Sequence, residues 1–133
     1  MTISIRQHVD AVAALLTAAG LPTTIAEASD DAEPPFVVLW PTPGLTHAVP
    51  LNSPNSDVTL DFQMTCVGET AEQALWTHDK ARAAIDRVTP TVSGRSARPI
   101  FSEFQPQPVR RDDAVNPPLF VAISEWSLRT SPS

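Results

Sequence analysis

The stretch from Asp57 to Val67 constrains the fold most, because its apolar and polar side chains alternate strictly. The apolar members occupy every second position, and they are Val58, Leu60, Phe62, Met64 and Cys66. Successive side chains of a β-strand point to opposite faces, so this pattern predicts a strand with one buried face and one polar face. A sheet that contains such a strand needs a second layer that covers its apolar face.

Two segments carry the signals of amphipathic helices that could form this layer. Ser4 and Gln7 match a capping box, and Gly20 followed by a proline is a stop signal for the first helix. Its apolar positions have helical spacing, at Ile5, Val9, Val12, Leu16 and Ala19.

The second predicted helix runs from a capping box at Thr70 and Gln73 to about Val88. Its core face consists of Ala74, His78, Ala81, Ile85 and Val88, with Ala71 and Leu75 at the edge. Trp76 points away from this face. An exposed tryptophan favours either a contact with another subunit or cover by the chain's own proline-rich loop between Pro41 and Pro54.

Four further segments have the composition of strands. Thr23–Ala28 and Phe36–Trp40 are predicted to form a hairpin with a long tip, and Ile100–Gln105 and Leu119–Arg129 are predicted near the C-terminus. The element order is then α-β-β-β-α-β-β. This order predicts an α+β fold with one mostly antiparallel β-sheet and two helices packed on one face.

The length of 133 residues suits a single domain over residues 1–133. The chain has 14 prolines but only 4 glycines, and the prolines gather in stretches that include residues 41–56 and 106–118. We expect extended, turn-rich loops there, since proline interrupts helices and central strands.

Most catalytic and cofactor motifs are absent from the sequence. The glycines are too dispersed to cradle a phosphate, the histidines have no partners at metal-ligand spacing, and Cys66 falls on the apolar side of its strand. We therefore predict no catalytic residue, no cofactor and no metal. The net charge of −6 disfavours general nucleic-acid binding, and the single cysteine and the lack of a signal or membrane segment suggest cytoplasmic synthesis.

Four charged residues precede the last predicted strand: Arg110, Arg111, Asp112 and Asp113. Two interpretations remain open. In one, an aspartate caps its own backbone turn while the arginines stay in water; in the other, the segment forms ion pairs between subunits. A small metal-dependent hydrolase or nuclease that uses Asp112, Asp113 and Glu103 is a remote alternative, because the sequence offers no convergent base.

Asp57 and Asp61 lie on the polar side of the alternating strand, where the simplest expectation is a solvated face. Their spacing of four residues separates them by about 13 Å, which is too far for them to share a metal or a proton.

The segments DVTLDFQMTCVGETAEQALWTHDKARAAI and PVRRDDAVNPPLFVAISEWSLRT, in this order, resemble the tail terminator proteins of long-tailed phages that infect actinobacteria. The resemblance extends from Ser4 to Thr130. It implies a structural protein of the virion, not an enzyme, that assembles in the host cytoplasm.

Such proteins form a homo-oligomeric, typically hexameric ring that caps the head-proximal end of the tail tube, stops its polymerisation and provides the head-joining surface. The implied partners are the tail tube protein and a neck or head-completion protein, with DNA only as cargo in the lumen and no membrane. Arg110, Arg111, Asp112, Asp113 and Trp76 would then contact a neighbour. Asp57 and Asp61 would repel DNA if they faced the lumen. A head-side neck or connector adaptor is the alternative.

Overall fold

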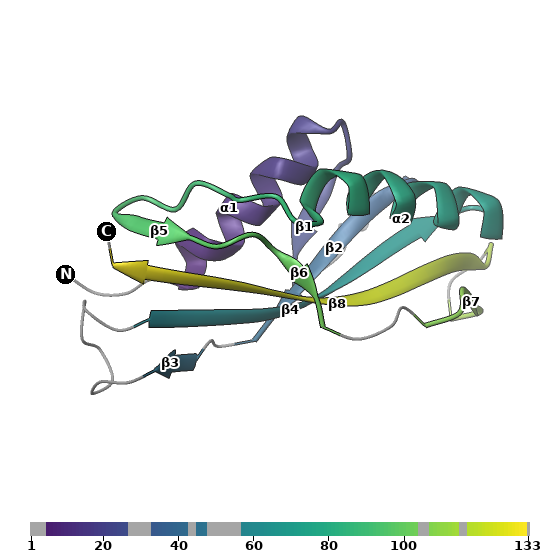
Figure 1. Ribbon diagram of the computed structural model, residues 1–133. Coiled ribbons are helices and arrows are strands. Elements are labelled where there is room, and N and C mark those ends of the chain that lie inside the picture. Colours follow the sequence, from purple (N-terminus) through teal and green to yellow (C-terminus); the bar gives the residue numbers. More distant parts are fainter. Residues whose placement is uncertain are drawn as a thin grey trace.

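The computed structural model describes residues 5–26, 33–42, 45–47, 57–103, 107–114 and 117–132. Within these residues two helices and eight strands form one sheet with a helical layer (Figure 1). The elements are α1 (Ile5–Ala18), β1 (Thr23–Ile25), β2 (Phe36–Pro41), β3 (Leu45–His47), β4 (Asp57–Gly68), α2 (Ala71–Ile85), β5 (Arg95–Ala97), β6 (Phe101–Ser102), β7 (Arg110–Asp112) and β8 (Leu119–Pro132).

The two long strands β4 and β8 form the centre of the sheet and pair antiparallel, from Val58 with Thr130 to Gly68 with Phe120. The other edge of β4 pairs with β2 and β3, and β2 pairs with β1. The other edge of β8 pairs in turn with three short strands, which are β7, β6 and β5 from its beginning to its end. All of these pairs except β1–β2 are antiparallel.

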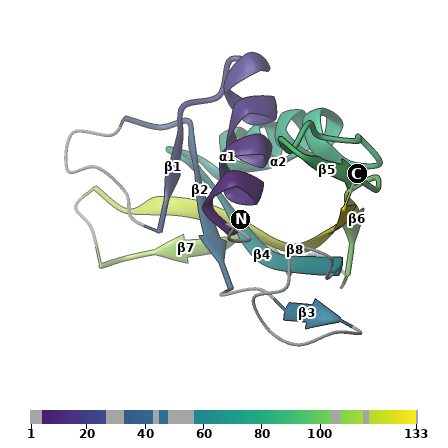
Figure 2. The same cartoon turned by 90° about the vertical axis from the view of Figure 1, so that its left-hand side faces the viewer.

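Both helices cover one face of the sheet, here called the inner face, and the opposite face is called the outer face (Figures 1 and 2). The alternation predicted for β4 is confirmed, since every even-numbered residue from Val58 to Cys66 is buried and every odd-numbered one from Asp57 to Thr65 is half-buried. The inner face and the helices enclose one main apolar cluster, which includes Val12, Leu16, Leu60, Ile85 and Trp126. Burial raises the pKa of Cys66 to about 12, so this thiol is an inert core residue, as predicted.

The helix ends follow the sequence signals only in part. Gly20 has φ +87° after α1, and the amides of Gly20 and Leu21 bind the carbonyls of Thr17 and Leu16, as the glycine stop signal predicted. The predicted cap at Ser4 lies outside the described residues. At α2, Thr70 accepts a hydrogen bond from the amide of Gln73 at 3.0 Å, which confirms the predicted N-cap. The side chain of Gln73 accepts in return from the amide of Glu69, one residue before the cap, at 2.6 Å.

The second helix ends at Ile85, before the predicted end at Val88. Its exit is fixed by Arg87, which adopts φ +61° and whose amide binds the carbonyl of Ile100. At the other end of the helix, a Cβ on Gly68 would come within 2.4 Å of the amide nitrogen of Ala74. Only glycine therefore allows this close turn from β4 into α2.

The predicted hairpin between the first two strands is wrong, because β1 and β2 pair in parallel, with Thr23 opposite Val37. Parallel pairing requires the connection to return along the length of the first strand. The connection that makes this return includes residues 27–32, which lie outside the described residues. Apolar content predicts that strands exist, but not the direction in which they pair.

Three short strands were not predicted. β3 lies inside the expected loop 41–56, β7 lies inside the expected loop 106–118, and β5 follows α2. The predicted strand Ile100–Gln105 is reduced to β6 among the described residues. These strands carry polar or mixed sequences, and their pairing with β4 and β8 holds them in place. The α+β class and the placement of both helices on one face are confirmed.

Candidate assembly surfaces

The outer face of β4 and β8 divides into an apolar part and a polar part. At the end of the sheet near β7, Phe36, Val38 and Val67 form a small buried cluster with Leu119 and Val121. Toward the middle and the far end, the outward side chains become polar. Asp61 lies opposite Ser127, and Gln63 lies opposite Glu125. Two adjoining hollows open on this polar part.

The first hollow has a volume of about 360 Å³, and we call it the carboxylate groove. Its lining residues are Trp40, Thr42, Asp61, Phe62, Gln63, Glu103, Glu125 and Trp126. Three of these side chains are carboxylic acids, and none of the described residues in the lining is basic. Trp40 is 42% exposed, and its indole nitrogen donates to the hydroxyl of Thr65 at 3.2 Å.

The acids of the groove are held close together by the backbone. The amide of Glu103 donates to the carbonyl of Glu125 at 3.1 Å, which places β6 and its following residue against the middle of β8. Limited hydration, then the negative charge of Asp61 and a side-chain hydrogen bond with it, and then the charge of Glu125, raise the pKa of Glu103 above its ordinary value. The groove therefore brings carboxylates of like charge close together.

Asp61 has a further unfavourable feature. Its Oδ1 is shielded from solvent and has no hydrogen-bond partner. Its backbone carbonyl, by contrast, accepts hydrogen bonds from both the amide and the hydroxyl of Thr42, at 2.9 and 2.8 Å. A shielded carboxylate oxygen without a donor costs free energy unless a donor arrives from outside.

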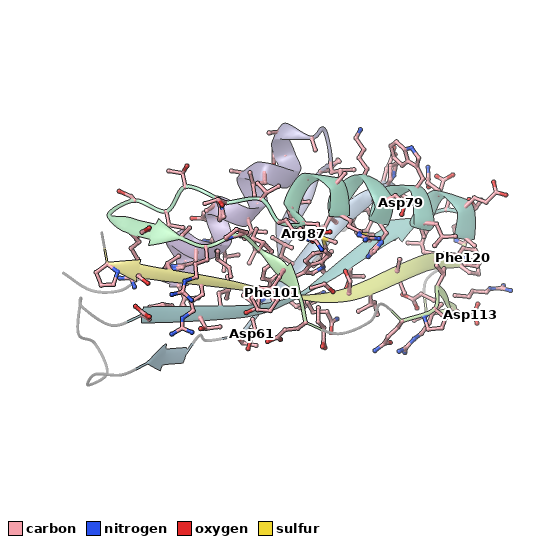
Figure 3. The ribbon with its side chains drawn as sticks, viewed as in Figure 1. Asp61, Asp79, Arg87, Phe101, Asp113 and Phe120 are labelled. Carbon is pink, nitrogen blue, oxygen red and sulfur yellow. The ribbon has the colours of Figure 1, made fainter. Side chains whose placement is uncertain are left out.

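The second hollow, about 640 Å³ in volume, shares Asp61 and Glu103 with the first but has basic residues at its other side. Its remaining lining comprises Thr59, Arg98, Pro99, Phe101, Ser127 and Arg129. Phe101, which lines the second hollow, is 49% exposed, and Figure 3 shows it near Asp61 in the middle of the sheet. The second hollow thus combines two acids, two arginines and one exposed aromatic ring.

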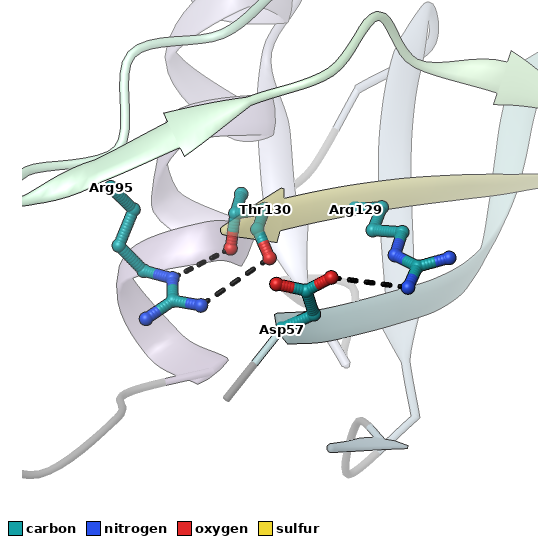
Figure 4. A network of polar contacts seen from close by, with 4 residues as sticks. All are labelled: Asp57, Arg95, Arg129 and Thr130. Atoms are coloured by element: carbon teal, nitrogen blue, oxygen red, sulfur yellow. Dashed lines mark hydrogen bonds and ion pairs between the residues drawn. The ribbon is translucent and has the colours of Figure 1, made fainter. Parts of the chain in front are cut away.

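Asp57 belongs to a separate polar network at the far end of β4 and β8 (Figure 4). Arg129 donates to its carboxylate at 3.1 Å. A hydrogen bond from Ser131 and the nearby charge of Arg129 hold the pKa of Asp57 below its ordinary value, against the opposing effect of burial. Next to it, Arg95 donates to the hydroxyl of Thr130 at 2.7 Å and to the carbonyl of the same residue at 3.3 Å. Asp57 and Asp61 therefore have different surroundings.

The first three residues of the charged segment 110–113 form β7, and Asp113 begins a turn. Asp112 accepts a hydrogen bond from the amide of Ala114 at 3.0 Å, and Arg111 pairs with Asp113 at 2.7 Å. Arg110 instead donates to the side-chain carbonyl of Gln107. The predicted turn with an aspartate cap is therefore present. Of the two arginines, Arg111 pairs with an acid of its own segment, whereas Arg110 donates to an uncharged amide side chain.

Trp76 lies on the solvent side of α2 and is 51% exposed, with the ammonium group of Lys80 at 5.0 Å from its ring centroid. Leu75 beside it is also 51% exposed. The two side chains form an apolar ridge on the helix. Much of the loop between Pro41 and Pro54, which was the alternative cover for Trp76, lies outside the described residues.

The remote enzyme alternative is not supported by the positions of its three acids. Glu103 lies beside Glu125, whereas Asp112 pairs with Leu119 six positions away along β8. This spacing corresponds to about 20 Å. Among the described residues no group of three or more histidine, cysteine or acidic side chains could hold a metal ion.

Sequence reasoning did not identify Trp40, Phe101, Arg98 or Glu125 as surface residues of interest. Trp40 was predicted only as the end of an apolar strand, and Phe101 and Glu103 are neighbours of Asp61 through the pairing of β6 with β8. The available signal was the alternation in β8, which places Glu125 on the same face as Gln63. In the described part of the chain, neither helix has the length and apolar character required to span a membrane.

No family model and no curated protein matches the sequence. Among solved structures, a chain in the "Virion of native gene transfer agent (GTA) particle" has a similar fold, with a TM-score of 0.58 and 12% sequence identity. The similarity covers 90% of this chain and 84% of that chain. At this identity the likeness shows the fold alone, and it shows that the fold occurs in a component of an assembled virion particle.

Proposed function

We propose that the chain is a structural subunit of a phage-type virion, and that within the virion it acts as the tail terminator. In this role it forms a ring on the head-proximal end of the tail tube, ends tube growth and offers a surface to the head or neck. The observation that carries the proposal is the fold shared with a gene transfer agent virion chain over 90% of the present chain.

The surfaces of the subunit support an assembly role. Exposed aromatic and aliphatic side chains occur on both layers, with Leu75 and Trp76 on α2 and Trp40 and Phe101 on the outer face. Exposed aromatic rings with charged neighbours are typical of protein–protein contacts. A closed ring of identical subunits needs two different contact surfaces on each copy, and this chain has separate surfaces that could serve as such a pair.

The proposed neighbour contacts comprise the segment Arg110–Asp113 and the ridge around Trp76. Figure 1 shows that the beginning of α2 and the strand β7 lie at the same end of the sheet, in the helical layer and at the sheet edge respectively. One neighbour that covered this end could therefore touch both. The lumen position of Asp57 and Asp61 remains a prediction for the structure of a ring to test.

The test is the native mass of the purified protein, alone and mixed with the tail tube protein of the same particle, combined with electron microscopy of the tubes. We expect a closed ring and tubes that carry one ring at a single end. A protein that stays monomeric in both conditions and leaves tube length unchanged would contradict the proposal. A ring located on the head side of the neck would instead favour the adaptor.

Charge reversal of Arg110 and Arg111 together should prevent ring formation and leave the melting temperature of the monomer nearly unchanged, because both side chains are exposed. The control is Arg6→Glu, which reverses an exposed arginine on α1. A monomer that unfolds after the double reversal would show that these arginines stabilise the subunit itself.

A further inference from the structure

The carboxylate groove has the properties of a binding site for a cation, since none of the described residues in its own lining is basic. Asp61, Glu103 and Glu125 crowd together, and Asp61 Oδ1 is shielded without a hydrogen-bond donor. The indole of Trp40 forms part of the wall. An arriving positive charge would relieve the repulsion, and a planar cation could also stack on the indole.

Arginine fits this groove better than lysine does. Its planar guanidinium presents several N–H donors in a fixed geometry that matches carboxylates, and it stacks on aromatic rings. Several arginines of the chain already have acidic partners: Arg6 with Asp10, Arg82 with Asp86, Arg111 with Asp113 and Arg129 with Asp57.

Arg110 is exposed, and within the described residues it forms no ion pair; its hydrogen-bond partner is the uncharged Gln107. Opposite residues of an antiparallel pair share a face, and Arg110 lies opposite Val121, so it is on the outer face like the groove. Along β8, however, Val121 and Glu125 are about 13 Å apart. The arginine and the groove are therefore two separate, complementary surfaces of one chain.

We propose that the carboxylate groove receives the Arg110 guanidinium of a second copy of this chain. This inference rests on the proposed ring. It identifies the acids of the carboxylate groove as the partners of the segment Arg110–Asp113 of a neighbouring copy. Repeated from copy to copy, the contact joins two different surfaces and is heterologous, which is the kind of contact that closes rings. In this contact Asp61 lies between subunits, so the predicted lumen position would then apply to Asp57 alone.

The experiment uses two conservative variants of the full chain. Arg110→Gln removes the guanidinium and leaves the groove intact, whereas Glu103→Gln/Glu125→Gln reduces the charge of the groove and leaves Arg110 intact. Native mass is measured over a range of concentrations for the wild type, for each variant alone and for their equimolar mixture. Arg6→Gln is the control for loss of one exposed positive charge, and melting temperatures check the fold.

We expect each variant alone to need about a tenfold or greater concentration for association, while Arg6→Gln behaves as wild type. In the mixture, Arg110 of the groove variant can bind the intact groove of Arg110→Gln, so one-to-one pairs should form. Such a pair should not grow, because it has an altered groove at one end and no Arg110 at the other. Pairs in the mixture should also exceed those of either variant alone.

Two results would overturn the proposed contact while leaving the ring in place. One is wild-type association of both variants, and the other is a mixture that pairs no better than its components. A wild-type protein that stays monomeric alone and with tube protein would overturn both the ring and the contact. If association stopped at two copies and depended on both Arg110 and the groove, the ring would be contradicted but the Arg110–groove contact would stand.

Discussion

The two faces of the β4–β8 ladder have almost opposite properties, although they alternate residue by residue along the same strands. On the inner face, Leu60, Met64 and Leu128 have no exposed surface. On the outer face, Asp61, Gln63 and Glu125 line an open groove. The inner face stabilises the subunit by burial, whereas the polar part of the outer face, away from the Phe36–Val38–Val67 cluster, contributes little to folding. Its side chains can therefore be suited to a partner without loss of the fold.

Replacement of inner-face residues should give the largest effect. Leu60→Ala should lower the free energy of unfolding by about 2–5 kcal/mol, because it leaves a cavity in a closed core. The matched outer-face variant, Gln63→Ala, should change it by about 0.5 kcal/mol or less. Urea unfolding of the two variants measures the difference. If both variants lost a similar free energy of unfolding, the outer-face residue would stabilise the subunit as much as the inner-face residue does.

A smaller effect, on the pH dependence of the free energy of unfolding, should come from His78 on the inner side. This side chain is 8% exposed, and its Nε2 has no hydrogen-bond partner. Burial lowers the pKa of His78 in the folded chain below 6.5, although Asp79 partly opposes this effect. The unfolded chain then binds a proton more readily, so the free energy of unfolding should fall as the pH drops below about 6.5.

His78→Gln should flatten this pH dependence between about pH 7.5 and 5.5, whatever its effect on stability at neutral pH. The comparison of unfolding curves for wild type and variant across this range measures the slope. Equal slopes for the two proteins would show that His78 does not titrate differently in the folded and unfolded states.

The smallest effect should come from the ion pair Arg111–Asp113, whose side chains are 60% and 72% exposed. A double-mutant cycle with Arg111→Ala and Asp113→Ala should give a coupling energy in the monomer of about 0.5 kcal/mol or less, because water screens the pair. A coupling several times larger would mean that this end of the outer face stabilises the subunit, and it would weaken the contrast between the faces.

The inner face could be predicted from the sequence, because period-two alternation in β4 and helical spacing in α1 depend only on local geometry. The same reasoning identified the caps at Thr70 and Gly20. It did not predict the direction of β1–β2 or the short strands β3, β5 and β7, since these depend on long-range pairing with β4 and β8.

The outer surfaces were predicted less completely for the same reason. Charge and composition singled out Arg110, Arg111 and Trp76, and the structure places all three at exposed positions. The groove joins residues far apart in the chain, such as Trp40 and Glu125, which the sequence gives no reason to consider together. Only the registers of β2, β6 and β8 bring them into one site.

The strand β8 spans 14 residues, yet its edge opposite β4 pairs with three separate strands of 3 or fewer residues and not with one long strand. Between these strands, the amides of Arg98, Glu103 and Gln107 also donate to carbonyls of β8, while the β4–β8 register runs without a break. This edge is therefore modular: a descendant sequence could lengthen or replace one connection and so acquire a new neighbour, while the central ladder and its hydrophobic layer are inherited unchanged.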